Sequence, residues 1–121
     1  MGTLAIATAI AATPATAFAA DTVTWDHIWT ATGVKVYVAE YGDIISVCDT
    51  SANGHAARAT ITDDTIGFTY YSITASGGAG TCVTHRASDG ASYDLIEGSK
   101  ITISYDGNGG AYASTGYVND H

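Results

Sequence analysis

The residues best suited to chemistry in this chain lie around its first cysteine. The stretch "VCDTSANGHA" places Cys48, Asp49 and His55 close together, and these are residue types of nucleophilic and metal-binding sites. A zinc site needs about four ligands in a closed geometry, and a nucleophile needs a base and an orienting group within hydrogen-bond reach. If the cysteine is oxidised, only two ligand-type side chains remain. The stretch favours a strand that ends in a turn, with Gly54 at a positive φ.

The other histidines and carboxylates form no catalytic or metal-binding motif. The four histidines have no repeated spacing. Four acidic residues could be paired as in glycosidases, namely Glu40, Asp43, Asp94 and Glu97, but every acidic protein offers such pairs. The segment "DGNGG" at 106–110 lacks the acidic residue that completes a calcium loop, so calcium would need acidic loops that converge in the fold, and a hairpin turn is the better interpretation. We predict no catalytic residue, no metal site and no cofactor.

The start of the chain predicts export. Residues 1–19, "MGTLAIATAIAATPATAFA", are apolar and uncharged and end in a small-x-small pattern of the kind that signal peptidase cleaves. The stretch lacks the usual basic segment, which is consistent with a signal that starts further upstream. Its threonines and Pro14 argue against a membrane anchor. In an exported chain, the even count of two cysteines predicts a disulfide between Cys48 and Cys82.

Length and charge limit the organisation and the partners. Residues 20–121, about 100 residues, are enough for one domain with a single core. All the charged side chains lie in this part and give a net charge of −8. Such a surface repels nucleic-acid phosphates and anionic lipids, so neither nucleic acid nor a membrane is an expected partner of the mature chain.

The pattern of this domain is that of short β-strands. Apolar and polar residues alternate, as with Val34, Val36 and Val38 on one face, and Thr, Val, Ile and Tyr are frequent. Eight strands are predicted: Thr22 to Trp29, Val34 to Tyr41, Ile44 to Cys48, Ala56 to Thr62, Ile66 to Thr74, Thr81 to Arg86, Lys100 to Tyr105 and Ala111 to Val118. Their spacing predicts an all-β fold, an antiparallel β-sandwich of immunoglobulin-like type, with a small barrel as the alternative.

Three short motifs span most of this domain: "GDIISVCDTSANGHA", "SGGAGTC" and "DLIEGSKITI". With them, the segment from about Val34 to Tyr105 resembles a group of small exported proteins of streptomycetes and related actinobacteria. The resemblance implies export and a β-sandwich with one disulfide. In size, export and domain type the chain is also similar to the small adaptor subunit of secreted umbrella-shaped toxin particles, which implies a protein that joins a lectin-like subunit to a stalk protein.

Aromatic residues are the candidates for binding a partner. In "TVTWDHIWT", alternation places four residues on one face of an extended strand, and the adjacent Tyr70 and Tyr71 require that one of the two faces outward. The candidate partner-binding residues are Val23, Trp25, His27, Trp29, Tyr70 and Tyr71. These side chains belong either to the core or to a surface that binds another protein, where Trp and Tyr are enriched. Aromatic faces also stack on sugars.

The sequence therefore predicts a secreted, non-enzymatic protein-binding module whose partner is another secreted protein. The more specific prediction is that the chain is an adaptor subunit of an extracellular toxin-type complex. A carbohydrate-binding module and an extracellular protease inhibitor are the alternatives. The inhibitor is disfavoured because such proteins present rigid loops held by extra disulfides or prolines, and the domain contains neither.

Overall fold

The chain forms short strands throughout the part that the structure describes. The computed structural model describes residues 23–121, so the predicted signal peptide lies outside the described residues. The strands are β1 (His27–Ala31), β2 (Val34–Ala39), β3 (Ile44–Asp49), β4 (Ala57–Asp63), β5 (Phe68–Ala75), β6 (Cys82–His85), β7 (Lys100–Asp106) and β8 (Ala113–Val118), with the 3-10 helices η3 (Ala87–Asp89) and η4 (Ala91–Tyr93) before β7. Each strand overlaps one predicted segment. No helix in the range 23–121 is long and apolar enough to cross a membrane.

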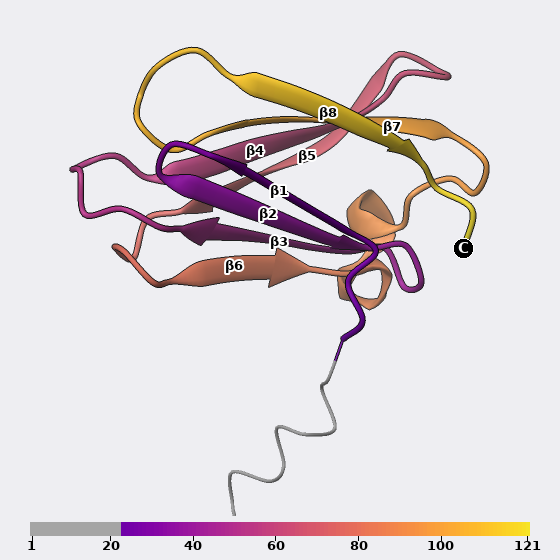
Figure 1. Cartoon of the computed structure of the whole chain (residues 1–121). Coiled ribbons are helices and arrows are strands. Elements are labelled where there is room, and N and C mark those ends of the chain that lie inside the picture. Colours follow the sequence, from indigo (N-terminus) through magenta and orange to yellow (C-terminus); the bar gives the residue numbers. More distant parts are fainter. Residues whose placement is uncertain (1–22) are drawn as a thin grey trace, which may run out of the picture.

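The strands form two antiparallel sheets that pack face to face (Figure 1). Sheet A has the order β1-β2-β3-β6, and sheet B has the order β5-β4-β7-β8. The chain changes sheet between β3 and β4, between β5 and β6, and between β6 and β7. The predicted β-sandwich is therefore confirmed.

The core lies between the sheets and follows the alternation of the sequence. Val34, Val36 and Val38 of β2 are buried, and Ile101 and Ile103 of β7 are buried opposite them in sheet B. The intervening side chains point outward and are partly exposed. Burial of one such aliphatic side chain contributes about 1.5 to 3 kcal/mol, so the alternating pattern fixes which face of each strand points inward.

The predicted disulfide is present. Cys48 and Cys82 are bonded, and they pair directly across β3 and β6. Their neighbours Val47 and Val83 pack on the core side, so the bond lies on the outer face of sheet A. In antibody domains the conserved disulfide joins the two sheets, whereas this one joins neighbouring strands within a sheet.

Three loops gather at one end of the sandwich, on the left in Figure 1, which we call the loop end. The loops are residues 50–56, 76–81 and 107–112, and the turn between β1 and β2, which contains Gly33, lies beside them. The Asn53 amide donates a hydrogen bond to the carbonyl of Gly107 at 2.9 Å, and the N–H of Thr50 donates to the carbonyl of Gly33 at 3.1 Å. A Cβ on Gly33 or Gly107 would collide with the backbone of the other residue. This close approach ties the loops together and requires glycine at both positions.

The segment at 106–110 is a hairpin turn, as predicted. The carboxylate of Asp106 accepts hydrogen bonds from the N–H groups of Asn108, Gly109 and Gly110 at 3.1 to 3.3 Å. Its oxygens therefore close the loop between β7 and β8.

The opposite end of the sandwich is held by a buried carboxylate. Asp43, which is 2% exposed, accepts hydrogen bonds from the N–H of Leu95 at 2.9 Å and from the side-chain amide of Asn119 at 3.0 Å. Burial raises the pKa of Asp43 to about 6, helped by the nearby charges of Glu97 and Asp94 and opposed by these two hydrogen bonds. The carboxyl group of Asp43 therefore connects its own segment with those of Leu95 and Asn119, which are distant in the sequence.

Stability should fall as the pH rises through the pKa of Asp43. Because the folded chain holds this proton more tightly than its ordinary pKa of 3.8 allows, the contribution of Asp43 to stability is greatest below about pH 4 and is lost as the pH rises to about 6. The shift is worth at most about 3 kcal/mol, and we expect about 2 kcal/mol. The contribution is measured as the difference in the free energy of unfolding in urea between the wild type and Asp43→Asn, from about pH 4 to about pH 6. Asparagine tolerates the left-handed backbone of residue 43, whose φ is 53°. If the difference between the two proteins does not change with pH, the prediction is wrong.

Candidate functional site

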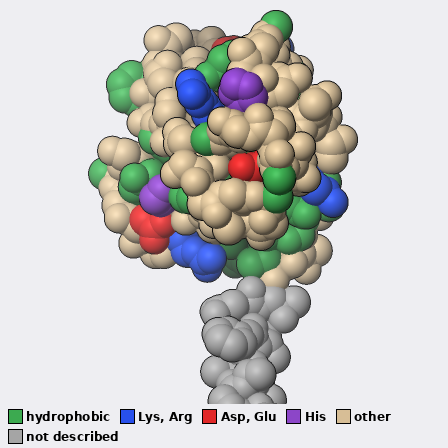
Figure 2. Space-filling view, turned by 90° about the vertical axis from the view of Figure 1, so that its left-hand side faces the viewer, with side chains coloured by type: hydrophobic (Ala, Val, Ile, Leu, Met, Phe, Trp, Pro, Cys, Tyr) green, Lys and Arg blue, Asp and Glu red, His purple; other side chains and the backbone are tan. Residues whose placement is uncertain are grey.

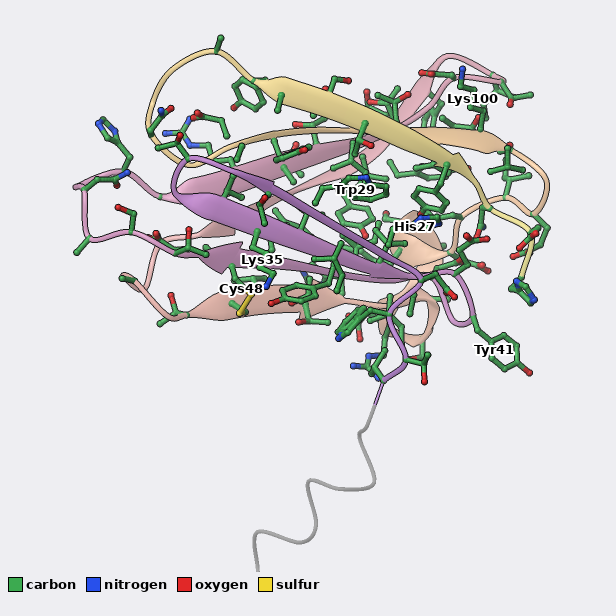
Figure 3. The ribbon with its side chains drawn as sticks, viewed as in Figure 1. His27, Trp29, Lys35, Tyr41, Cys48 and Lys100 are labelled. Atoms are coloured by element: carbon green, nitrogen blue, oxygen red, sulfur yellow. A yellow bond between two sulfur atoms is a disulfide. The ribbon has the colours of Figure 1, made fainter. Side chains whose placement is uncertain are left out.

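The structure separates the candidate partner-binding residues of the N-terminal strand. His27 and Trp29 pair with the inward-facing Val38 and Val36, and Figure 3 shows both rings between the sheets near β8. Their rings stack at 5.1 Å, and Tyr117 of β8 lies 5.0 Å from His27 and 6.2 Å from Trp29. These two aromatic side chains therefore close the side of the sandwich between β1 and β8.

Trp25 lies on the opposite side of sheet A, so the expectation that Val23, Trp25, His27 and Trp29 share one face is wrong. Strand β1 begins at His27, and the chain bends before it at Asp26. The Asp26 carboxylate accepts a hydrogen bond from the N–H of Glu40 at 2.8 Å and holds the bend. The bend ends the alternation, and the Trp25 ring packs at 5.3 Å on the outward-facing Tyr37. Val23 is half-buried.

Tyr70 and Tyr71 both pack against the core, so the expectation that one of them faces outward is also wrong. The pairing of β4 with β5 shifts between Ile61 and Thr62, which leaves Tyr70 as an extra residue in β5. Such a β-bulge places two successive side chains on the same side of a strand. Tyr71 packs edge-on against Tyr93 at 4.6 Å, and burial raises its pKa.

The hydroxyl of Tyr70 is part of a structural network. It donates a hydrogen bond to Asp63 at 2.9 Å and accepts one from the N–H of Ile96 at 3.1 Å. Burial alone would raise the pKa of Asp63, but hydrogen bonds from Ser99, Tyr70 and two backbone N–H groups outweigh it and lower the pKa. Tyr70 therefore connects two loops and is not free to bind a partner through its hydroxyl.

The outer face of sheet A is the surface to which Trp25 belongs. Register and alternation place these strand residues on it: Ile28, Thr30, Lys35, Tyr37, Ala39, Ile44, Ser46, Cys48, Cys82 and Thr84. None of them is acidic, although the chain has twelve acidic residues. Ile28 is 51% exposed. Lys35 is the single charged residue of the set, and its ammonium lies 5.2 Å from the centre of the Tyr37 ring. We call these residues, together with Trp25, the sheet A face.

Most of this face could not be identified from the sequence. Trp25 was predicted to be a binding residue, but Tyr37, Lys35 and Ile28 were not, because the outward positions of sheet A become one surface only when the strand order is known. The signal available in the sequence was the absence of acidic residues from the outward positions of "VKVYVA" and "IISVC".

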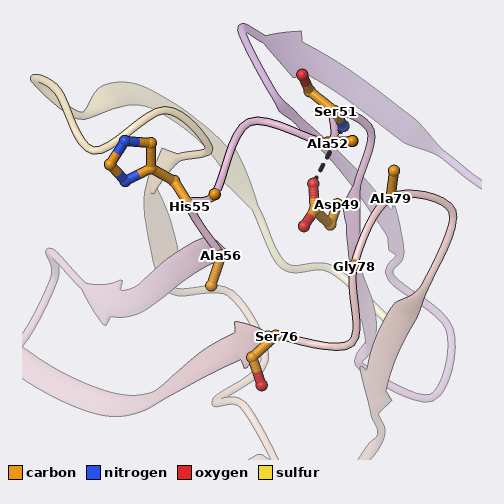
Figure 4. A pocket seen from close by; sticks show the side chains of 9 residues that line it. Asp49, Ser51, Ala52, His55, Ala56, Ser76, Gly78 and Ala79 are labelled. Atoms are coloured by element: carbon orange, nitrogen blue, oxygen red, sulfur yellow. Dashed lines mark hydrogen bonds between the residues drawn. The ribbon is translucent and has the colours of Figure 1, made fainter.

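A cavity of about 510 Å³ lies at the loop end (Figure 4). It is lined by Asp49, Ser51, Ala52, Gly54, His55, Ala56, Ser76, Gly78 and Ala79. Asp49 is 3% exposed, and its Oδ1 accepts a hydrogen bond from the N–H of Ser51 at 3.1 Å. Figure 2 shows the molecule from this end, where backbone and uncharged side chains cover most of the surface.

The side chains of Cys48, Asp49 and His55 do not converge on one site. Cys48 is in the disulfide on the outer face of sheet A. Asp49, the next residue of β3, points the other way, into the cavity. His55 packs against Gly109, where an added Cβ would come within 2.7 Å of the imidazole. The turn is built as expected, with Gly54 at a φ of 79° and Asn53 accepting a hydrogen bond from the N–H of His55.

A second polar cluster joins residues far apart in the sequence, and sequence analysis did not find it. Ligand atoms of Glu40, Asp120 and His121 lie within 4.8 Å of one another. One Glu40 oxygen contacts the His27 imidazole at 2.6 Å, and the other accepts a hydrogen bond from the N–H of Asp120 at 3.3 Å. These contacts engage both oxygens of Glu40, so hydrogen bonding accounts for the cluster, and we propose no metal there.

Comparisons of the chain with models of protein families, with curated proteins and with solved structures find no match. The roles of its residues must therefore follow from their own geometry.

Proposed function

We propose that this chain is a secreted, non-enzymatic protein-binding module that docks another secreted protein on the sheet A face. The observation that carries the proposal is the aromatic and acid-free composition of this face in a chain with a net charge of −8. The centres of protein interfaces are depleted in charged residues and enriched in aromatic ones. Trp25 and Tyr37 are of the types most frequent among binding hot spots. The disulfide and the apolar segment 1–19 support export.

The edge of sheet A extends this surface. Among the strands of residues 23–121, β1 is the edge strand of sheet A and pairs with β2 alone. A strand of the partner could add to this edge through backbone hydrogen bonds, while its side chains meet Ile28 and Tyr37. Backbone pairing combined with aromatic anchors suits a stable subunit contact, and this supports the adaptor role in an extracellular complex.

A sugar ligand is supported less well than a protein. The apolar C–H face of a sugar ring stacks best on an open, coplanar aromatic platform, but the rings of Trp25 and Tyr37 are tilted at 46° to each other. Lys35 also lies over the Tyr37 ring.

Replacement of Trp25 should abolish capture of the partner. The tagged chain is secreted by the organism that makes it, and proteins that co-purify from the medium are quantified by mass spectrometry. Loss of a hot spot worth about 2 kcal/mol weakens binding about 30-fold. We therefore expect Trp25→Ala to lose a partner that the wild type recovers in stoichiometric amounts.

The matched control is Phe68→Ala, because Phe68 is 52% exposed and lies on sheet B. It should recover as much partner as the wild type. Equal recovery with Trp25→Ala, or recovery of the bait alone by the wild type, would contradict the proposed function.

A further inference from the structure

The cavity at the loop end contains a buried carboxylate without a cationic partner. Asp49 is 3% exposed, and the described residues give its side chain one hydrogen bond, from the N–H of Ser51 to Oδ1. Within residues 23–121, each ion pair joins a histidine to a carboxylate, and none includes Asp49. Oδ2 accepts no hydrogen bond from the described residues and is not one of their fully enclosed polar atoms. It therefore faces the open cavity and can accept a hydrogen bond from a cationic group.

The walls of the cavity leave room for such a group. Ala52, Ala56, Gly78 and Ala79 present only methyl groups or backbone. A volume of about 510 Å³ is within the range of about 300 to 1,000 Å³ of ligand sites. It exceeds one side chain, so a residue can enter together with part of its backbone. Ser51 and Ser76 are also in the lining, but their hydroxyls point away from Asp49 in Figure 4, so the carboxylate is the acceptor that the site offers.

The site is preformed by backbone contacts. The N–H of Asp49 donates to the carbonyl of Thr81 at 2.9 Å, and the carbonyl of Asp49 accepts from the N–H of Gly80 at 2.7 Å. Asn53 fixes the 50–56 loop to Gly107 at 2.9 Å. A ligand would therefore meet a carboxylate already in place, which lowers the cost of ordering on binding.

We propose that this cavity binds a lysine or arginine side chain presented by a partner protein, with Asp49 as its counter-ion. The net charge of −8 attracts a basic surface, and the ammonium or guanidinium would complete the hydrogen bonding of the carboxylate. This contact goes beyond the proposed function, because it involves the loop end and none of the residues of the sheet A face.

The inference can be tested by NMR on the disulfide-bonded, ¹⁵N-labelled chain. The probes are Nα-acetyl-lysine methylamide, Nα-acetyl-arginine methylamide and the lysine compound acetylated on Nε, which has no charge. We expect saturable, millimolar amide shifts confined to residues 50–56 and 76–81 with at least one of the charged compounds. The neutral compound should produce none.

Three variants make the result specific. Asp49→Asn keeps the acceptor for the N–H of Ser51 but removes the charge, and it should weaken binding at least tenfold. Ser76→Phe should block the cavity and leave Asp49 in place, which covers the case in which Asp49→Asn fails to fold. Trp25→Ala should bind the probes as the wild type does, so failure of the docking face and failure of this site can be told apart. No saturable shift with either charged compound, an equal response to the neutral compound, or unchanged binding by Asp49→Asn would overturn the inference.

Discussion

Loss of the Cys48–Cys82 disulfide should lower the free energy of unfolding by about 4 kcal/mol. The bond closes a loop with a sequence separation of 34 residues, and the chain-entropy relation gives about 4 kcal/mol for a loop of this size. A small domain has a total stability of about 5 to 15 kcal/mol. We therefore expect the reduced protein to be only marginally stable at room temperature, as measured by urea unfolding with and without reductant.

The position of the bond allows a clean control. Cys82 is exposed and the pair lies on the outer face of sheet A, so the double replacement Cys48→Ala with Cys82→Ala opens no large cavity in the core. This variant should match the reduced wild type and should not respond to reductant. If the free energy of unfolding falls by less than about 1 kcal/mol both in the reduced wild type and in the double variant, the bond does not restrain the unfolded chain as expected.

The two tryptophans should contribute very differently to the stability of the fold. Trp29→Ala should destabilise the fold by about 3 kcal/mol, near the lower end of the range for aromatic-to-alanine changes in cores. The reason is that the Trp29 ring packs on the core between His27 and Tyr117. Trp25→Ala should cost about 1 kcal/mol or less, because Trp25 contacts Tyr37 on the outer face. Urea unfolding of both variants measures the difference.

Phenylalanine variants at the two positions are the matched controls. Trp29→Phe keeps an aromatic ring against Tyr117 and should recover most of the stability lost in Trp29→Ala. Equal losses for Trp25→Ala and Trp29→Ala would show that Trp25 also supports the fold. Its surface would then be a poor candidate for a docking site.

The alternation of side chains was sufficient to predict the eight strands and the β-sandwich. It failed where the backbone leaves the regular pleat. The bend at Asp26 moves Trp25 to the other face, and the bulge at Tyr70 keeps two adjacent tyrosines on one side. Neither Asp26 nor Tyr70 belongs to a motif that predicts its irregularity, because each depends on a hydrogen-bond partner that is distant in the sequence, Glu40 and Ile96.

The candidate sites could be predicted only in part for the same reason. Asp49 was recognised as a residue able to do chemistry, but its burial in a cavity depends on a second loop that contributes Ser76 and Ala79. The sheet A face depends on strand order, and the contact between Glu40 and Asp120 joins residues 80 positions apart. Local sequence patterns contain no information about which distant loops converge.

The direction of the strands relative to the loop end determines the geometry of any assembly built on this chain. The sheet A face runs parallel to the strands, whereas the cavity of Asp49 opens where the strands end (Figures 1 and 4). Partners bound at these two places would lie roughly perpendicular to each other rather than in line. In an assembly that used both contacts, the two partners would meet this subunit at about a right angle. The outer face of sheet B would remain exposed to solvent.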